Sequence, residues 1–196
     1  MIFKLLNKTR NTLREWILNR SQGRNAKIWL MTISFAESSF FPIPTDFFLL
    51  AILLGNRAKW LYYSFLTTIS SVAGGLMGYL IGFLFFDLIG EFIIQTYSLQ
   101  DEMIIVSEMF KENAFWAIFI SAFTPIPFKI FTISAGFFHI DILIFFVASL
   151  IGRTMRIFSV GYLVKTFGKQ IVHYVFEYFN YVTFIALLIL ALIILF

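Results

Sequence analysis

Apolar residues form long runs in this chain, and polar or proline-containing segments end or interrupt each run. Continuous apolar runs cover residues 60–86 and 140–164, and each exceeds the roughly 20 apolar residues that cross a bilayer as a helix. A last apolar stretch, residues 174–196, predicts a C-terminal transmembrane helix. The fold class that this pattern predicts is an all-α polytopic membrane protein.

Two other apolar segments are interrupted by paired prolines. They are residues 28–55, with Pro42 and Pro44, and residues 113–137, with Pro125 and Pro127. The pieces of the first segment have about 14 and 11 residues, and at about 1.5 Å per residue neither comfortably spans a core about 30 Å thick. Each segment therefore predicts a re-entrant helical hairpin with its prolines at the tip.

The two proline-containing segments are copies of each other. Residues 38–48 read SSFFPIPTDFF and residues 121–131 read SAFTPIPFKIF, so six residues recur 83 positions apart (121 against 38). The same spacing relates Gly78-Tyr79 to Gly161-Tyr162, which indicates an internal duplication. Each unit has one hairpin and one crossing, so the second unit enters from the opposite face. The sequence predicts an inverted repeat whose hairpin tips meet near the midplane.

Charge orients these segments in the membrane. Residues 1–27 hold seven Lys or Arg and one Glu, which predicts a basic amphipathic segment on the cytoplasmic side. Arg57 and Lys59 follow the first hairpin, so both of its ends are predicted inside. Residues 87–112 hold six acidic residues and one Lys, which predicts an outer-face connector with a short surface helix.

Composition supports a membrane protein and narrows its chemistry. The chain is 60% hydrophobic with a mean hydropathy of +0.87, which a soluble domain of 196 residues could not bury. It has no Cys, and its two His, His139 and His173, lack the spacing of metal ligands. We therefore expect no metal and no other cofactor. Enzymatic catalysis is not expected either, because the membrane segments lack Ser-His or paired Asp arrangements.

Five ionisable residues fall inside the apolar segments. They are Glu37, Asp46, Lys129, Arg153 and Arg156. Each costs roughly 2.5–3.5 kcal/mol at the bilayer centre, so pairing or water must offset the cost. One hypothesis is that the two acids relay charge or protons while the three cations bind a phosphate or another anion. The alternative is that the five residues only form ion pairs that lock the repeats together.

Small residues at regular spacing predict close helix packing. Gly74, Gly78 and Gly82 recur every four residues in the first crossing, as small residues do where membrane helices touch. Short hydroxyl residues near the prolines are candidates for a cavity lining, although such side chains often bond a carbonyl of their own helix. These are Ser38, Ser39, Thr124 and Ser134.

Several of these motifs occur together in one family. They are Glu37, Pro42-Ile43-Pro44 with Asp46, the glycines from Gly74 to Gly82, Phe123 to Lys129, Ser134-Ala135-Gly136, and Gly152-Arg153 with Arg156. In this order they resemble the DedA family of bacterial inner-membrane proteins, in the YqaA-like branch of the SNARE-associated, VTT-domain superfamily. The resemblance covers roughly residues 30–165.

The resemblance implies paired inverted re-entrant hairpins and a role in moving lipid across the membrane, often dependent on the proton motive force. Glu37 and Asp46 match the acidic positions that the family needs. One departure concerns the second proline motif, where the family pattern places arginines. Ala122 and Phe128 stand there, and the nearest cation is Lys129, a point charge instead of a bidentate fork.

We expect a lipid transporter or scramblase of the bacterial inner membrane, with a cytoplasmic N-terminus, that moves phospholipid or polyprenyl phosphate. Its expected partners are membrane lipids, and protons are a candidate coupling ion. The sequence allows a homo-oligomer, and no nucleic-acid partner is expected. One alternative is a proton-coupled transporter of a soluble solute or ion. Another is a membrane scaffold that transports nothing.

Overall fold

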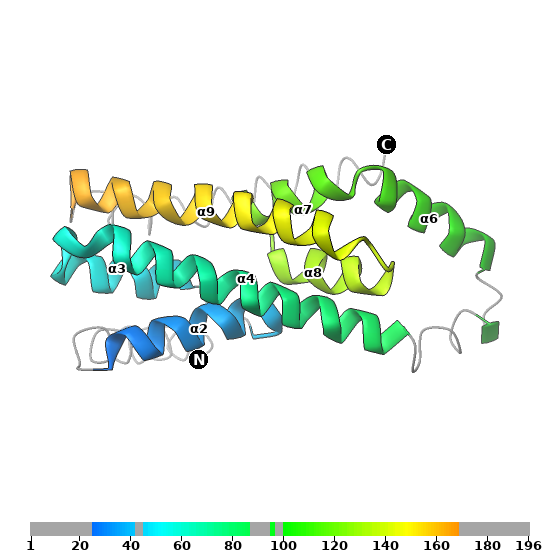
Figure 1. Ribbon diagram of the computed structural model, residues 1–196, viewed down its shortest axis with the longest axis horizontal. Coiled ribbons are helices and arrows are strands. Elements are labelled where there is room, and N and C mark those ends of the chain that lie inside the picture. Colours follow the sequence, from blue (N-terminus) through cyan, green and yellow to red (C-terminus); the bar gives the residue numbers. More distant parts are fainter. Residues whose placement is uncertain (1–24, 42–44, 87–94, 97–99, 169–196) are drawn as a thin grey trace, which may run out of the picture.

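The structure is a computed structural model that describes residues 25–41, 45–86, 95–96 and 100–168 (Figure 1). These residues contain helices and no strand, which confirms the all-α prediction for them. The helices are α2 (Ala26–Ser39), α3 (Thr45–Gly55), the 3-10 helix η1 (Arg57–Lys59), α4 (Trp60–Phe85), α6 (Gln100–Glu112), α7 (Ala114–Phe123), α8 (Phe128–Phe137) and α9 (Ile142–Phe167). Most of segment 1–27, Pro42, Pro44, parts of 87–112 and all of 174–196 lie outside the described residues.

The helix ends follow from local sequence. Thr124, which precedes Pro125, is extended (φ −87, ψ 170), because a following proline disfavours the helical conformation. Helix α7 therefore ends at Phe123, and α8 begins directly after Pro127. At the start of α9, the Asp141 carboxylate accepts hydrogen bonds from the backbone N–H groups of two residues in the first turn.

Helices α4 and α9 form the long axis of the bundle. Each has 26 residues, which corresponds to about 39 Å at 1.5 Å per residue. Of the described helices, only α9 and the continuous stretch of η1 and α4 (Arg57–Phe85) are long and apolar enough to cross a membrane. The two long helices pack against each other and run in opposite directions (Figure 1).

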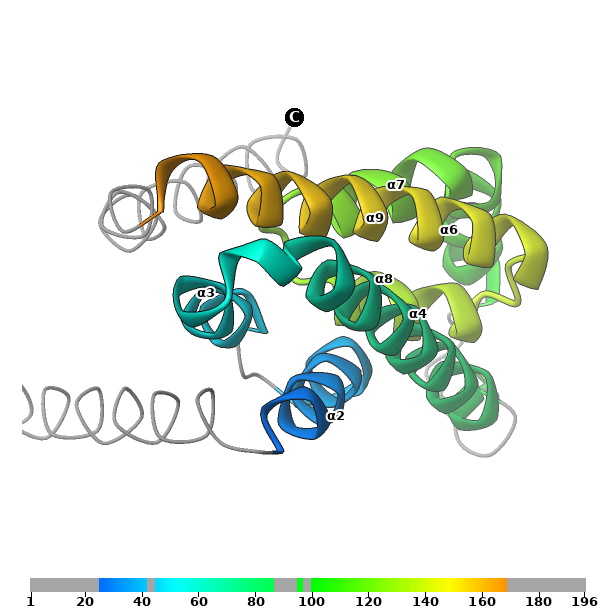
Figure 2. The same ribbon diagram turned by 60° about the vertical axis from the view of Figure 1, so that its left-hand side comes forward.

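Two pairs of short helices flank the long ones. The pair α2 and α3 opens toward one end of the bundle and the pair α7 and α8 toward the other (Figure 1). The end of α2, the start of α3 and the turn between α7 and α8 lie near the middle. Helix α2 packs on α4 as α7 packs on α9, and α8 packs on α4 as α3 packs on α9. The first residues of α3 and α8, Thr45 and Phe128, are 83 positions apart (128 against 45), the spacing of the sequence repeat. Figure 2 shows α3 beside α2 and below the C-terminal half of α9.

Glycines bring α4 into direct backbone contact with its neighbours. A Cβ atom at Gly82 would overlap the carbonyl oxygen of Ile133 in α8, and one at Gly136 of α8 would overlap the carbonyl oxygen of Tyr79 in α4. Gly74 lies in the same way against the backbone of α2. Larger residues at these three positions would force the helices apart, because a backbone does not yield as a side chain does.

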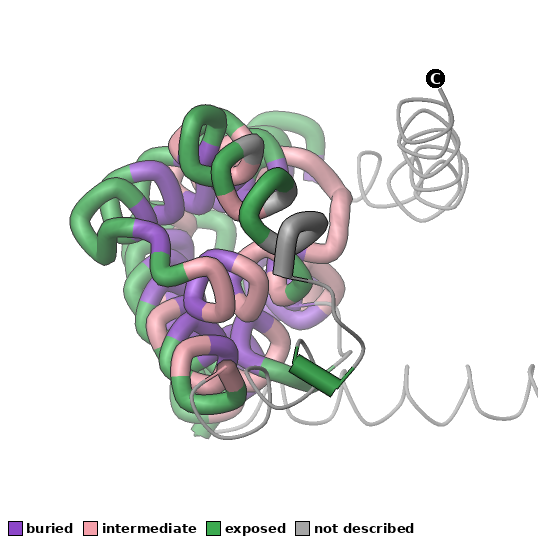
Figure 3. Tube along the Cα trace, turned by 90° about the vertical axis from the view of Figure 1, so that its right-hand side faces the viewer, coloured by how far each residue is buried: buried purple, intermediate pink, exposed green. Residues whose placement is uncertain are grey.

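The bundle has two apolar clusters inside and many apolar side chains outside. One buried cluster, around Leu30 and Phe48, joins α2, α3 and α9, and another, around Tyr79 and Phe145, joins α4, α7, α8 and α9. Large apolar side chains also face outward, up to 68% exposed at Leu143, and Figure 3 shows the exposed positions along the outer faces. An apolar outer face of this extent fits contact with lipid.

Candidate functional site

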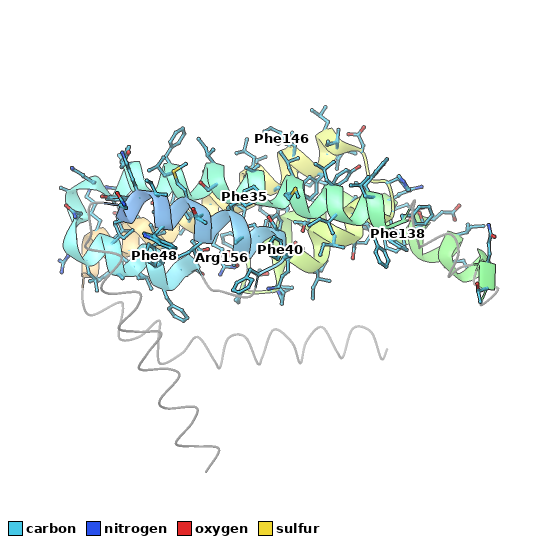
Figure 4. The ribbon with its side chains drawn as sticks, turned by 90° about the horizontal axis from the view of Figure 1, so that it is seen from below. Phe35, Phe40, Phe48, Phe138, Phe146 and Arg156 are labelled. Atoms are coloured by element: carbon cyan, nitrogen blue, oxygen red, sulfur yellow. The ribbon has the colours of Figure 1, made fainter. Side chains whose placement is uncertain are left out.

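Polar side chains gather where the end of α2 and the start of α3 meet the middle of α9. Glu37 lies in the last turn of α2 and Asp46 in the first turn of α3. Arg153 and Arg156 lie near the middle of α9, three residues apart and so on one side of that helix. Figure 4 shows the label of Arg156 near that of Phe40, the residue that directly follows α2. We call these four residues the central charge cluster.

Arg153 is almost completely enclosed by protein. Its Nη2 donates to Glu37 Oε2 at 3.0 Å and to Ser38 Oγ at 2.7 Å, and its Nε donates to Ser71 Oγ on α4. The guanidinium also lies 4.8 Å from the centre of the Phe128 ring on α8. These contacts offset the cost of burying the charge, since the Arg153 side chain is only 5% exposed.

Arg156 links the two pairs of short helices. Its Nη2 donates to Asp46 Oδ2, at the start of α3, and its Nη1 donates to the backbone carbonyl of Thr124, at the end of α7. The carbonyl lies where the prolines interrupt the helix, so an arginine donor replaces a missing helical partner. The Arg156 and Asp46 side chains are 15% and 18% exposed, so this pair is less enclosed than Arg153.

Hydroxyl groups complete the environment of Glu37. Thr45 Oγ1 donates to Glu37 Oε2 at 3.1 Å, and Ser38 and Ser71 share a hydrogen bond of 2.7 Å. The Glu37 side chain is 25% exposed, the largest value in the central charge cluster. The more accessible acid thus faces the more deeply buried arginine.

Lys129 stands apart from these ion pairs. It lies in the first turn of α8, half-buried, at the position that the repeat relates to Asp46. Its side chain makes no hydrogen bond or ion pair with a residue that the structure describes. The structure therefore brings together four of the five ionisable residues and leaves the fifth without a carboxylate partner among the described residues.

The remaining predicted site residues fall in three places. Pro125 and Pro127 form the half-buried turn between α7 and α8, and Pro42 and Pro44 are outside the described residues. A Cβ atom at Gly78 would overlap Thr132 Oγ1 of α8, so Gly78 lies with Gly74 and Gly82 in the contacts of α4. His139 is exposed beside the Phe83 and Phe86 rings, and His173 is outside the described residues. Within the described part of the chain, no group of three or more acidic, His or Cys residues could hold a metal ion.

Sequence reasoning missed Ser71 and Thr45 as members of the site. A signal for Ser71 does exist, since hydroxyl residues in the apolar helix α4 recur on one face. They are Ser64, Thr67, Thr68 and Ser71, and all four are buried. A polar stripe at helical spacing in a membrane-length helix indicates a buried neighbour that needs polar contacts.

Comparison with known proteins identifies the family of this chain. Residues 43–166, more than half of the chain, match the VTT domain. The chain belongs to the VTT domain family. This family is membrane-associated, in agreement with the two membrane-length helices. The matched VTT domain includes Asp46, Lys129, Arg153 and Arg156, whereas Glu37 precedes it.

Two bacterial relatives of this VTT-domain protein align over 159 residues. An uncharacterized protein of Haemophilus influenzae is 31% identical, and the alignment covers 81% of this chain and 82% of the relative. A homologous protein of Histophilus somni is also 31% identical, with 81% and 83% covered. No solved structure matches the chain.

Proposed function

We propose that this VTT-domain protein moves phosphate-bearing lipids, phospholipids or polyprenyl phosphates, across the inner membrane of a bacterium. The observation that carries the proposal is the central charge cluster, halfway along a membrane-length helix whose outer face is apolar. Charges at that depth suit a polar headgroup that has to pass the hydrocarbon core, while the acyl chains remain in the surrounding lipid.

The proposed topology is an inverted repeat in which each pair of short helices is a re-entrant hairpin. Support comes from the helix lengths, since α2, α3, α7 and α8 have only 10 to 14 residues. Interrupted helices with polar ends near the midplane are typical of transporters built from inverted repeats. This topology makes the protein multi-pass and fits the YqaA-like branch of the DedA proteins.

Charge at the ends of the bundle supports a cytoplasmic N-terminus. The end where α2 and α4 begin and α9 terminates carries four exposed basic residues, Lys27, Arg57, Lys59 and Lys165. Aromatic side chains accompany them, with the Lys165 ammonium 5.3 Å from the centre of the Trp60 ring. Glu108, Glu112 and Asp141 are exposed toward the opposite end, with Lys111. By the positive-inside rule the basic end faces the cytoplasm.

In the proposed mechanism, an anionic headgroup competes with the carboxylates for the cations of the site. Arg156 exchanges Asp46 for the phosphate, and Lys129 supplies a cation that no described carboxylate neutralises. Arg153 adds positive potential beside Glu37. Protonation of either acid would free its arginine for the phosphate, so these acids also offer a route for coupling to protons.

A membrane scaffold remains the second candidate, because one observation favours it. Protein groups already surround Arg153, as expected for a charge whose role is to hold helices together. A scaffold would bind lipid only as solvent and would carry none across. The transport measurement separates the two functions directly.

The test is lipid scrambling by the purified full chain in liposomes. Headgroup-labelled lipids of three classes (zwitterionic, anionic and polyprenyl phosphate) are exposed to an outer-leaflet quencher, with and without a pH gradient. We expect quenching beyond the outer-leaflet fraction for at least one class, its loss in folded Glu37→Gln and Asp46→Asn, and slower quenching at low lipid fraction in folded Arg156→Gln. Glu108→Gln on α6 is the matched control, because its side chain is exposed and does not belong to the central charge cluster. No quenching beyond the outer leaflet for any class would refute the proposal.

A further inference from the structure

The two arginines of α9 have different surroundings. Arg153 donates to Ser38, Ser71 and Glu37, and it lies over the Phe128 ring. Arg156 has one carboxylate and one backbone carbonyl as partners and is more exposed. Bringing a substrate phosphate to Arg153 would mean removing several protein contacts, while bringing one to Arg156 would mean displacing Asp46.

Ser38 and Ser71 account for this difference. Both are fully buried, they come from different helices (α2 and α4), and they are hydrogen-bonded to each other at 2.7 Å. Each hydroxyl oxygen accepts from a different nitrogen of the same guanidinium, Ser38 from Nη2 and Ser71 from Nε. A planar guanidinium that is bound through two nitrogens keeps its orientation as well as its place.

A neutral hydroxyl pair is suited to this task. Carboxylates in place of the two serines would neutralise Arg153 and remove its attraction for Glu37. Apolar residues would leave its Nε–H group without a partner in a buried site, at the full cost of desolvation. Hydroxyl oxygens satisfy the donors and leave the positive charge in place. Glu37 therefore always meets the same cation in the same orientation.

We propose that Ser38 and Ser71 are positioning residues that hold Arg153 as a fixed charge for Glu37, which leaves Arg156 as the arginine of α9 that takes the substrate phosphate. This assignment rests on the proposed lipid transport. It predicts that loss of a serine slows transport without weakening the binding of the anionic lipid.

The test compares Ser71→Ala with a matched control on the same helix. Ser64 is also a fully buried serine of α4, but among the described residues its hydroxyl has no hydrogen-bond partner, so Ser64→Ala removes none. Scrambling is measured in phosphatidylcholine liposomes at increasing mole fractions of labelled phosphatidylglycerol. The two quantities read are the maximal rate and the mole fraction that gives half of it.

We expect Ser71→Ala to lower the maximal rate at least about tenfold, the lower limit for the loss of one hydrogen bond to a charged group, with the half-saturating fraction unchanged. Arg156→Gln should raise the half-saturating fraction, Ser64→Ala should change neither quantity, and Ser71→Thr, which keeps the hydroxyl, should restore the rate. Should Ser71→Ala raise the half-saturating fraction as Arg156→Gln does, Arg153 contacts the lipid and the proposal is wrong. A rate unchanged in Ser71→Ala would also overturn it.

A second readout keeps the contact testable without transport. Thermal unfolding of Ser71→Ala, Arg153→Gln and the double variant forms a double-mutant cycle. The effects should be non-additive, because both substitutions remove the same hydrogen bond, while the cycle of Ser64→Ala with Arg153→Gln should be additive. Additive effects at Ser71 would overturn the positioning role. Failure of the proposed function appears separately, as absent scrambling by the unmodified protein. If Ser71→Ala does not fold, Ser38→Ala and Ser38→Thr carry the same comparison.

Discussion

The contact between α4 and α8 gives the sharpest prediction for stability, through Gly82→Ala. A Cβ at this position would overlap the carbonyl oxygen of Ile133 and lie 2.8 Å from its carbonyl carbon and 3.0 Å from the backbone nitrogen of Phe137. All three obstacles are backbone atoms of α8, so no rotamer change relieves the clash. Gly55→Ala is the matched control, because a Cβ there would have no atom within 4 Å.

The magnitude follows from two opposing terms. Overpacking of a well-packed contact costs about 1–3 kcal/mol, with the upper part of that range expected when backbone is the obstacle. Alanine gains about 1 kcal/mol over glycine in helix propensity. We therefore expect Gly82→Ala to lower the free energy of unfolding by about 2 kcal/mol, and Gly55→Ala to leave it unchanged or raise it by about 0.4–1 kcal/mol.

Both variants are measured in the same detergent by chemical unfolding, followed by the fluorescence of the native tryptophans. The comparison of two identical substitutions cancels the detergent contribution and any general effect of alanine in a helix. The reasoning is refuted if Gly82→Ala is as stable as Gly55→Ala. That result would mean that α4 and α8 are not in backbone contact.

Four other substitutions test particular contacts. Arg153→Gln should cost about 3–5 kcal/mol in the same unfolding assay, because it removes the hydrogen bonds to Glu37, Ser38 and Ser71 together and leaves Glu37 without its cation. Glu37→Gln should cost less, about 1.5–3 kcal/mol, since a Gln oxygen still accepts a hydrogen bond from Arg153; the reverse order would contradict the described surroundings of Arg153. Tyr79→Phe should cost about 1 kcal/mol by removing the 2.7 Å hydrogen bond from its hydroxyl to the Ile140 carbonyl, and an unchanged stability would argue against that bond. Lys129→Gln should leave the free energy of unfolding unchanged or raise it, and it should slow the scrambling of anionic lipids more than that of zwitterionic lipids. Equal slowing of both classes would argue against a role in anion binding.

Local rules explain why the helix breaks could be predicted from the sequence. A proline acts on its own residue and the one before it, so Pro125 and Pro127 determine where α7 ends and α8 begins regardless of the rest of the fold. Length acts in the same local way, since the apolar runs of α4 and α9 are visible without any neighbour. The 83-residue spacing of the sequence repeat also separates the first residues of α3 and α8 (128 against 45).

Partner choice within the charge cluster depends on more than the sequence. Three cations and two acids allow several pairings, and the one observed follows from the rotation of α9 about its axis and from the depth at which α2 and α3 meet it. Arg153 thereby reaches Glu37, Arg156 reaches Asp46, and Lys129 reaches neither. One residue of difference in register would turn these side chains about 100° away, in keeping with 3.6 residues per turn.

Ser71 is a single residue for which the local sequence favours one contact and tertiary packing provides another. A serine in an apolar helix usually bonds a carbonyl of its own helix, as Thr67 and Thr68 of this helix do, so sequence alone favours a local role. Packing of α2 on α4 brings Ser38 to its hydroxyl instead, and packing of α9 on α4 brings the Arg153 guanidinium. Such a contact joins residues 82 positions apart in the chain, and no local signal encodes it.

The sequence by itself determined the membrane character, the helical class, the duplication, the interrupted helices and the set of ionisable residues at issue. These properties depend on composition, on proline chemistry and on periodicity, which act over one or two turns of a helix. Tertiary structure alone decided which acid meets which arginine, that Arg156 links α3 to the end of α7, and that Ser38 and Ser71 enclose Arg153. Those contacts depend on the relative rotation and depth of α2, α3, α4, α7 and α9, which are set by packing between segments far apart in the sequence.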